Sequence, residues 1–131
     1  MYKLFLDDIR DPRMVYYYWT LPLYLTPDWT IVRNYDQFVN VINAKGMPEL
    51  ISFDHDLADV HYPKTAGDMN KPISYDNMTE KTGYHCAKWL IDYMIDNNIT
   101  DLPEIYVHSQ NPVGRENIKS LFDGFKKFME K

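Results

Sequence analysis

The segment LISFDHDL, which occupies residues 50–57, joins a short apolar run directly to three ionisable residues. Because a proline-containing segment precedes it, the apolar run at residues 50–53 predicts a short buried strand. Ionisable side chains at the end of a buried strand cost free energy unless the protein pairs or uses them. In an extended chain, Asp54 and Asp56 point to one side and His55 to the other. The segment therefore predicts a functional site after this strand, with a merely solvated polar loop as the alternative.

The composition favours one globular domain over residues 1–131, because 45% of the residues are hydrophobic and 15% are aromatic. The N-terminal segment turns acidic too early for a signal peptide, and no apolar run reaches membrane-spanning length, so we expect no membrane partner. Cys86 is the single cysteine, which excludes an internal disulfide and favours a cytoplasmic location. The net charge of −5, without a long basic block, argues against an extended nucleic-acid surface but not against a local phosphate pocket. The oligomeric state stays open.

Short apolar runs alternate with segments of helical periodicity along the chain. The predicted strands span residues 2–6, 29–33, 50–53 and 104–107, and the predicted helices span residues 35–45, 83–97 and 112–129. Asn111 is a suitable N-cap for the last helix, and Pro112 is a suitable first residue. This alternation of strands and helices predicts an α/β fold with a parallel sheet.

The segment between the first two predicted strands is rich in aromatic residues and proline. Because Pro12 disfavours a helix immediately there, we expect residues 14–28 to form an ordered aromatic loop. Its rings could cover one face of the sheet, which we favour, or form a lid on which a base stacks. A second long loop is expected at residues 58–81, and long loops in compact domains often serve function. His61 lies in that loop and is left out of the site, because a lone loop histidine is commonly solvated.

Ionisable or hydroxyl side chains follow three of the four predicted strands: Asp7 and Asp8, then Asp54, His55 and Asp56, and finally His108 and Ser109. Because ligands of parallel α/β sheets lie beyond the carboxyl ends of the strands, these side chains are expected at one edge of the sheet. Neighbouring strands lie about 4.8 Å apart, so carboxylates on adjacent strand ends can converge on one ion. Acidic oxygen clusters favour Mg²⁺, Ca²⁺ or Mn²⁺ over Zn²⁺, and the two histidines leave a softer metal open. We predict a site for Mg²⁺ or Mn²⁺, with the ligands Asp7, Asp8, Asp54 and Asp56.

The motifs at the strand ends resemble those of the cyclic-phosphate processing receiver-like family. The resemblance rests on LDDIR at residues 6–10, Val32-Arg33, ISFDHDL at residues 51–57, Thr82-Gly83 and VHSQNPVGR at residues 107–115, and it covers nearly the whole chain. It implies a flavodoxin-like three-layer fold, similar to that of response-regulator receivers, with a reduced parallel sheet of four strands in the order 2-1-3-4. It also implies roles for individual residues: Asp7 and Asp8 match the receiver's acidic pair, Asp54 its phosphoacceptor and Ser109 its hydroxyl residue.

Two expected features depart from an ordinary receiver. The aromatic loop replaces the helix between the first two strands, and no fifth strand ending in the receiver's lysine follows the last predicted helix. That lysine helps a receiver to hold its phosphoryl group, so its absence argues against phosphorelay signalling. The additional residues His55 and His108 favour catalysis instead.

Together, the resemblance and the site residues favour a metal-assisted phosphoesterase that processes cyclic phosphates of nucleotides or RNA ends. His108 and His55 would act as general base and acid, because imidazole titrates near neutrality, and Asp54 and Ser109 would complete the catalytic set. The expected phosphate-binding residues are Arg10, Arg33, Thr82, Asn111, Gly114 and Arg115, and the arginines have surface salt bridges as the alternative role. A non-catalytic module that binds a nucleotide or cyclic signal is the second hypothesis, followed by a phosphoacceptor receiver modified on Asp54.

Overall fold

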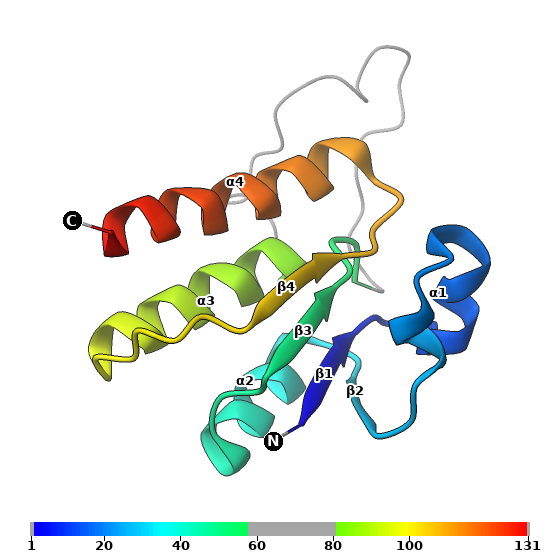
Figure 1. Ribbon diagram of the computed structural model, residues 1–131, viewed down its shortest axis with the longest axis horizontal. Coiled ribbons are helices and arrows are strands. Elements are labelled where there is room, and N and C mark those ends of the chain that lie inside the picture. Colours follow the sequence, from blue (N-terminus) through cyan, green and yellow to red (C-terminus); the bar gives the residue numbers. More distant parts are fainter. Residues whose placement is uncertain (1, 58–80, 131) are drawn as a thin grey trace.

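Parallel strands form the centre of the structure, a computed structural model that describes residues 2–57 and 81–130 (Figure 1). Within these residues the strands are β1 (Lys3–Leu6), β2 (Trp29–Val32), β3 (Leu50–Phe53) and β4 (Glu104–Val107), which form one sheet in the order β2-β1-β3-β4. Every neighbouring pair is parallel, and the register aligns Leu6 with Val32 and Phe53, and Phe53 with Val107. All four strands therefore end at the same edge, and the predicted α/β fold and strand order are confirmed.

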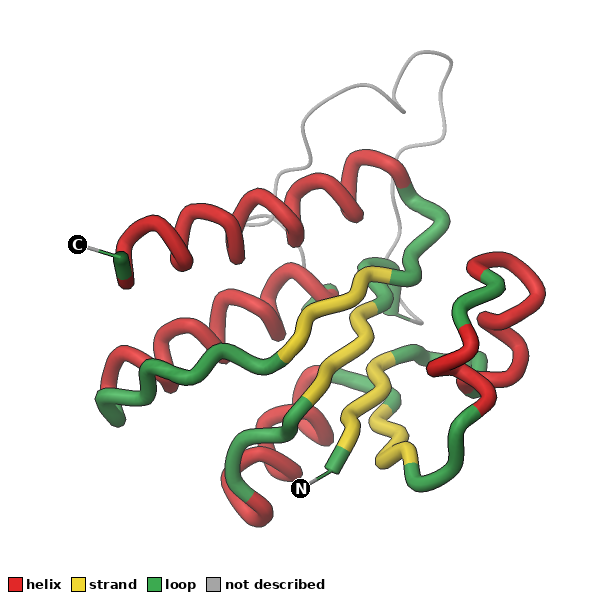
Figure 2. The backbone as a smooth tube through the Cα atoms, viewed as in Figure 1, coloured by secondary structure: helices red, strands yellow, loops and turns green. Residues whose placement is uncertain are grey.

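One face of the sheet is covered by α2 (Tyr35–Lys45), α3 (Gly83–Asp96) and α4 (Pro112–Met129), which Figure 2 shows as long helical segments. Alternate strand residues such as Leu4 and Phe53 point to this face and join a core with buried side chains from all three helices. Full burial of one such side chain stabilises the fold by about 1.5–3 kcal/mol. This apolar layer holds the strands whose ends carry the candidate site.

The prediction of an aromatic loop at residues 14–28 is wrong for much of the segment. The structure has a helix there, α1 (Pro12–Trp19), followed by a short 3-10 helix, η1 (Pro22–Leu25). Pro12 is the first helical residue, where its missing N–H group needs no partner, and the side chain of Asp11 caps the helix. The receiver's helix between its first two strands is therefore present in this chain.

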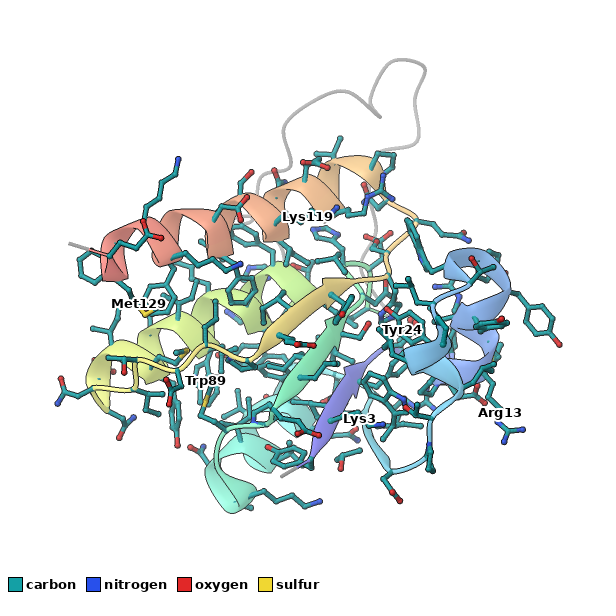
Figure 3. The ribbon with its side chains drawn as sticks, viewed as in Figure 1. Lys3, Arg13, Tyr24, Trp89, Lys119 and Met129 are labelled. Carbon is teal, nitrogen blue, oxygen red and sulfur yellow. The ribbon has the colours of Figure 1, made fainter. Side chains whose placement is uncertain are left out.

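The second face of the sheet is covered by aromatic side chains of α1, η1 and β2. Phe5, which alternates away from the main core, meets Val15 and Tyr24 in a separate buried cluster, and Trp19 and Trp29 pack against it. Tyr24 lies on the α1 side of the sheet in Figure 3. The expectation that aromatic rings cover this face is confirmed, and the three layers of the predicted fold are complete.

The chain around the predicted second loop is described only in part. Residues 58–80, which include His61, lie outside the described residues. In the part of the chain that the structure does describe, α4 is the last element and no strand follows β4. None of the described helices is both long enough and apolar enough to cross a membrane.

Candidate metal and phosphate site

Asp7, Asp54 and His108 meet at the carboxyl edge of the sheet. They directly follow β1, β3 and β4, and the aligned register of these strands places them side by side. One ligand atom from each lies within 4.8 Å of the other two, and all three residues are buried. Among the described residues, this group of acidic and histidine side chains could hold a metal ion. The strand ends converge as the parallel topology predicts.

Asp7 is held as a carboxylate by the groups around it. Its Oδ1 accepts hydrogen bonds from the backbone N–H groups of Ile9 (3.0 Å) and Arg10 (2.9 Å). Its Oδ2 accepts a hydrogen bond from Nε2 of His108 at 3.0 Å and lies 3.6 Å from the guanidinium group of Arg10. Burial alone would raise the pKa of Asp7, but the hydrogen bonds from His108 and the backbone lower this pKa to about 2. Asp7 is therefore ionised at neutral pH.

Asp54 lies in the opposite electrostatic situation. It is only 4% exposed, and it lies beside the carboxylate of Asp7. Burial, together with the negative charges of Asp7 and Asp56, raises the pKa of Asp54 to about 8, although Arg10 offsets part of the shift. Burial and the charge of Asp7 also raise the pKa of Asp8. The raised pKa values show that these carboxylates are unfavourable when ionised side by side, and a bound divalent cation would offset this cost.

A buried chain of hydrogen bonds fixes the ring of His108. Oη of Tyr24 lies 2.8 Å from Oγ of Ser52, and this Oγ lies 2.6 Å from Nδ1 of His108. Because Asp7 is ionised, Nε2 of His108 carries the proton and donates it, so Nδ1 accepts from Ser52 and Ser52 accepts from Tyr24. Burial lowers the pKa of His108, which favours this neutral ring. With these roles, every donor in the row of hydrogen bonds has an acceptor. The ring of His108 is therefore held with Nε2 toward Asp7.

The ring of His108 is also enclosed by aromatic neighbours. Phe5 stacks on it with ring centroids 4.6 Å apart, and Nε1 of Trp19 donates a hydrogen bond to its backbone carbonyl at 2.8 Å. His108 is 1% exposed, so its ring would have to leave Asp7 before it could touch a substrate. Sequence reasoning missed the partners Ser52 and Tyr24. The available signal was that Ser52 is the single polar residue inside the buried run at residues 50–53.

We expect Ser52→Ala to destabilise the protein by about 1–3 kcal/mol, because it leaves Nδ1 of His108 and the hydroxyl of Tyr24 without their buried partner. Urea unfolding measured at equilibrium gives the free energy of unfolding of each variant. Ser120→Ala, on the exposed side of α4, is the matched control and should change this free energy by less than about 0.5 kcal/mol. Equal effects of the two substitutions would show that the hydrogen-bond chain contributes nothing.

His55 and Asp56 form a second group, between the end of β3 and the start of α4. His55 is buried, and its Nδ1 lies 2.7 Å from Oδ1 of Asp56, which also accepts a hydrogen bond from Nδ2 of Asn111 at 3.1 Å. A Cβ atom on Gly114 would overlap the ring of His55, so only glycine lets α4 begin against this ring. The predicted ligand Asp56 is therefore tied to His55 and Asn111, outside the group of Asp7, Asp54 and His108.

Of the three predicted phosphate-binding arginines, Arg10 lies beside the buried carboxylates. Arg33 donates hydrogen bonds to the backbone carbonyls of Asp7 (3.2 Å) and Arg10 (2.7 Å). Arg115 donates to the backbone carbonyl of Ser109 at 3.1 Å. Arg33 and Arg115 thus stabilise the loops that carry site residues. The side chain of Arg10 is 22% exposed and remains within reach of a ligand.

The remaining predicted residues stabilise the starts of α3 and α4. Thr82 caps α3 and forms a reciprocal capping box with His85. Oγ of Ser109 accepts a hydrogen bond from the N–H group of Asn111 at 3.1 Å, and Oδ1 of Asn111 accepts one from Gly114 at 3.0 Å. Both helices start beside the strand ends, so their partial positive charges lie near the acidic edge.

A parallel sheet in the order 2-1-3-4, with acidic side chains at its carboxyl edge, defines a receiver-like α/β domain. The chain belongs to the family of cyclic-phosphate processing receiver domains, whose sequence model matches residues 2–124. Comparison with curated proteins gives no match, and comparison with solved structures gives none either. The family agrees with the resemblance found in the strand-end motifs, and its description ties this domain to cyclic-phosphate processing.

Proposed function

We propose that the protein is a metal-assisted phosphoesterase that opens cyclic phosphates of nucleotides or RNA ends. The observation that carries this proposal is the carboxyl group of Asp54, which is buried beside the ionised Asp7 and within 4.8 Å of its nearest ligand atom. A buried carboxyl group beside another carboxylate lowers the stability of the fold. Proteins keep such destabilising arrangements mainly at functional sites. The family description supports a cyclic phosphate as the ligand.

The donor set fits a hard divalent cation such as Mg²⁺ or Mn²⁺. Asp7 and Asp54 would hold the ion, with Asp8 beside them, because carboxylate oxygens suit these metals. Nε2 of His108 is hydrogen-bonded to Asp7, which favours oxygen ligands over a set that includes imidazole. When bound, such a cation neutralises charge on a phosphoryl oxygen and makes a coordinated water more acidic.

Arg10 is the residue best placed to hold the phosphate. Its guanidinium group lies 3.6 Å from Oδ2 of Asp7 and is partly exposed. Guanidinium groups bind phosphate oxygens through strong charge-assisted hydrogen bonds. The backbone N–H groups at the start of α4 favour an anion on the other side of the strand ends.

The structure supports different roles for the two predicted acid–base histidines. His108 is enclosed and bonded through both ring nitrogens, so we assign it to positioning Asp7. His55 is also buried, but it bonds Asp56, whose side chain is 46% exposed. We assign Asp56 to accept the proton of the attacking water, with His55 orienting its carboxylate.

The proposed reaction is hydrolysis of a cyclic phosphodiester. The oxygen of water bonds to phosphorus, one ring P–O bond breaks, and the leaving oxygen takes up a proton. The product is a phosphomonoester. The water loses one proton to Asp56 and supplies the hydroxyl that stays on phosphorus, and solvent supplies the proton of the leaving oxygen.

We expect the protein with Mg²⁺ or Mn²⁺ to convert nucleoside 2′,3′-cyclic phosphates, or RNA ends that carry this group, into phosphomonoesters. Phosphorus NMR or chromatography of the products checks this, and a chelator should abolish the conversion. If the protein binds a cyclic phosphate without turning it over, the proposed enzyme is wrong and the protein is a binding module. Stable phosphorylation of Asp54 by a small phosphodonor would support the receiver instead.

A further inference from the structure

The outer face of α1 carries exposed apolar side chains beside the acidic site. Met14, Tyr17 and Tyr18 have helical spacing, and their exposed fractions are 45%, 85% and 57%. The inner side of the same helix is buried through Pro12 and Val15, so α1 is apolar on both sides. The fold does not require exposed apolar side chains on this face, so an individual ring there is available to a ligand.

The position of α1 relative to the site is fixed by Trp19. Nε1 of this indole donates a hydrogen bond to the backbone carbonyl of His108 at 2.8 Å. The guanidinium group of Arg115 lies over the same ring, 5.3 Å from its centroid, and bonds the carbonyl of Ser109 at 3.1 Å. These contacts attach α1 to the loop that follows β4, beside the carboxyl edge of the sheet.

Arg10 connects this face to the buried carboxylates. Its guanidinium group lies 5.7 Å from the centroid of the Tyr18 ring and 3.6 Å from Oδ2 of Asp7. A cation thus separates the ring of Tyr18 from the acidic site, and it is the partly exposed cation that a phosphate would meet there. A nucleotide has matching parts at its two ends. Its phosphate can meet Arg10, and its flat aromatic base, which the sugar holds away from the phosphate, can meet Tyr18.

We propose that Tyr18 is a stacking platform for the base of a nucleotide whose phosphate is held at Arg10 and the acidic site. This inference rests on the proposed function and names its substrate class, a nucleoside phosphate rather than a bare sugar phosphate. Stacking on an aromatic ring tolerates every base, because each base has a π-face, so the platform confers no sequence preference. The positive charge of Arg10 complements the phosphate, and the ring of Tyr18 complements the base.

The experiment compares two ligands that share the cyclic phosphate and differ in the base: adenosine 2′,3′-cyclic phosphate and ribose 2,3-cyclic phosphate. Calorimetric titration with Mg²⁺ gives the affinity of each ligand for the wild type and for Tyr18→Ala, Tyr18→Phe and Tyr17→Ala. Tyr18→Ala should weaken binding of the adenosine ligand about 5- to 100-fold and leave the ribose ligand unchanged. Tyr18→Phe keeps the ring and should retain affinity. Tyr17→Ala removes the neighbouring, more exposed tyrosine of the same helix and should have no effect.

Several results would overturn the platform. Equal affinity of the wild type for both ligands would remove the base from recognition while leaving the proposed function intact. If Tyr18→Ala binds both ligands with unchanged affinity but self-associates more weakly in sedimentation, this face of α1 binds a second copy of the chain. Failure of both ligands to bind the wild type would overturn the platform together with the proposed function.

Discussion

Asp54→Asn is expected to raise the stability of the metal-free protein and to lower the turnover of a 2′,3′-cyclic nucleotide by at least about 100-fold. The two effects have one cause. The carboxyl group of Asp54 is buried next to Asp7, and a neutral amide of the same shape avoids the cost of ionising there. The same amide is a poor ligand for a divalent cation, so the metal should no longer stabilise the protein by linkage.

The pKa of Asp54 predicts how the effect of this substitution on stability changes with pH. The pKa of Asp54 is raised from its ordinary value of 3.8 to about 8 in the folded protein. The folded state therefore keeps a proton that the unfolded state loses, and the contribution of Asp54 to stability falls as the pH rises from 3.8 through about 8. Thermal unfolding across this pH range, without metal, should show that the gain in stability of Asp54→Asn over the wild type is largest at the alkaline end.

The control for this experiment is Asp123→Asn, which removes an exposed carboxylate of α4. It should change the free energy of unfolding by less than about 0.5 kcal/mol at every pH and should leave the response to Mg²⁺ intact. Asp54→Asn should instead stabilise the metal-free protein by about 1–3 kcal/mol near neutral pH. A melting temperature of the wild type that does not change with Mg²⁺ or Mn²⁺ would refute the metal site.

The strands, the long helices and the strand order could be predicted because each depends on local periodicity and on the parallel topology. The helix α1 could not, because the effect of a proline depends on its place in the helix. Pro12 excludes a helical conformation for the residue before it, yet it suits the first helical position once Asp11 supplies the cap. Reading the capping residue together with the proline would have predicted α1.

The convergence of Asp7, Asp54 and His108 also follows from topology, but their protonation does not. Ser52 lies 56 residues before His108, and Tyr24 lies 28 residues before Ser52, so no local pattern joins them. The ionised Asp7 places the proton of His108 on Nε2, and the hydroxyl groups of Ser52 and Tyr24 then satisfy Nδ1. Burial by Phe5 then decides that the ring faces no solvent. Side chains brought together by the fold, and not the spacing of motifs, determine the chemistry at this edge.

The second large effect is expected for His108→Ala, which should lower turnover about 10- to 100-fold, as loss of a residue that orients a metal ligand does. From sequence alone, His108 is a general base whose removal leaves stability nearly intact. The structure predicts a loss of at least about 2 kcal/mol in the free energy of unfolding, because the ring stacks on Phe5 and bonds Ser52 and Asp7. Chemical denaturation and steady-state kinetics on the same samples measure both quantities.

His108→Gln distinguishes the two roles of this residue. The amide N–H group of glutamine can still donate a hydrogen bond to Oδ2 of Asp7, but an amide cannot accept a proton from water near neutral pH. If His108 positions Asp7, the glutamine variant should recover most of the activity, and excess Mg²⁺ should rescue part of the activity of His108→Ala. If glutamine is as inactive as alanine, with unchanged metal affinity, His108 acts on the substrate as the general base. The ring would then have to leave Asp7 during each turnover, and the pH–rate profile of the wild type would include the titration of this imidazole.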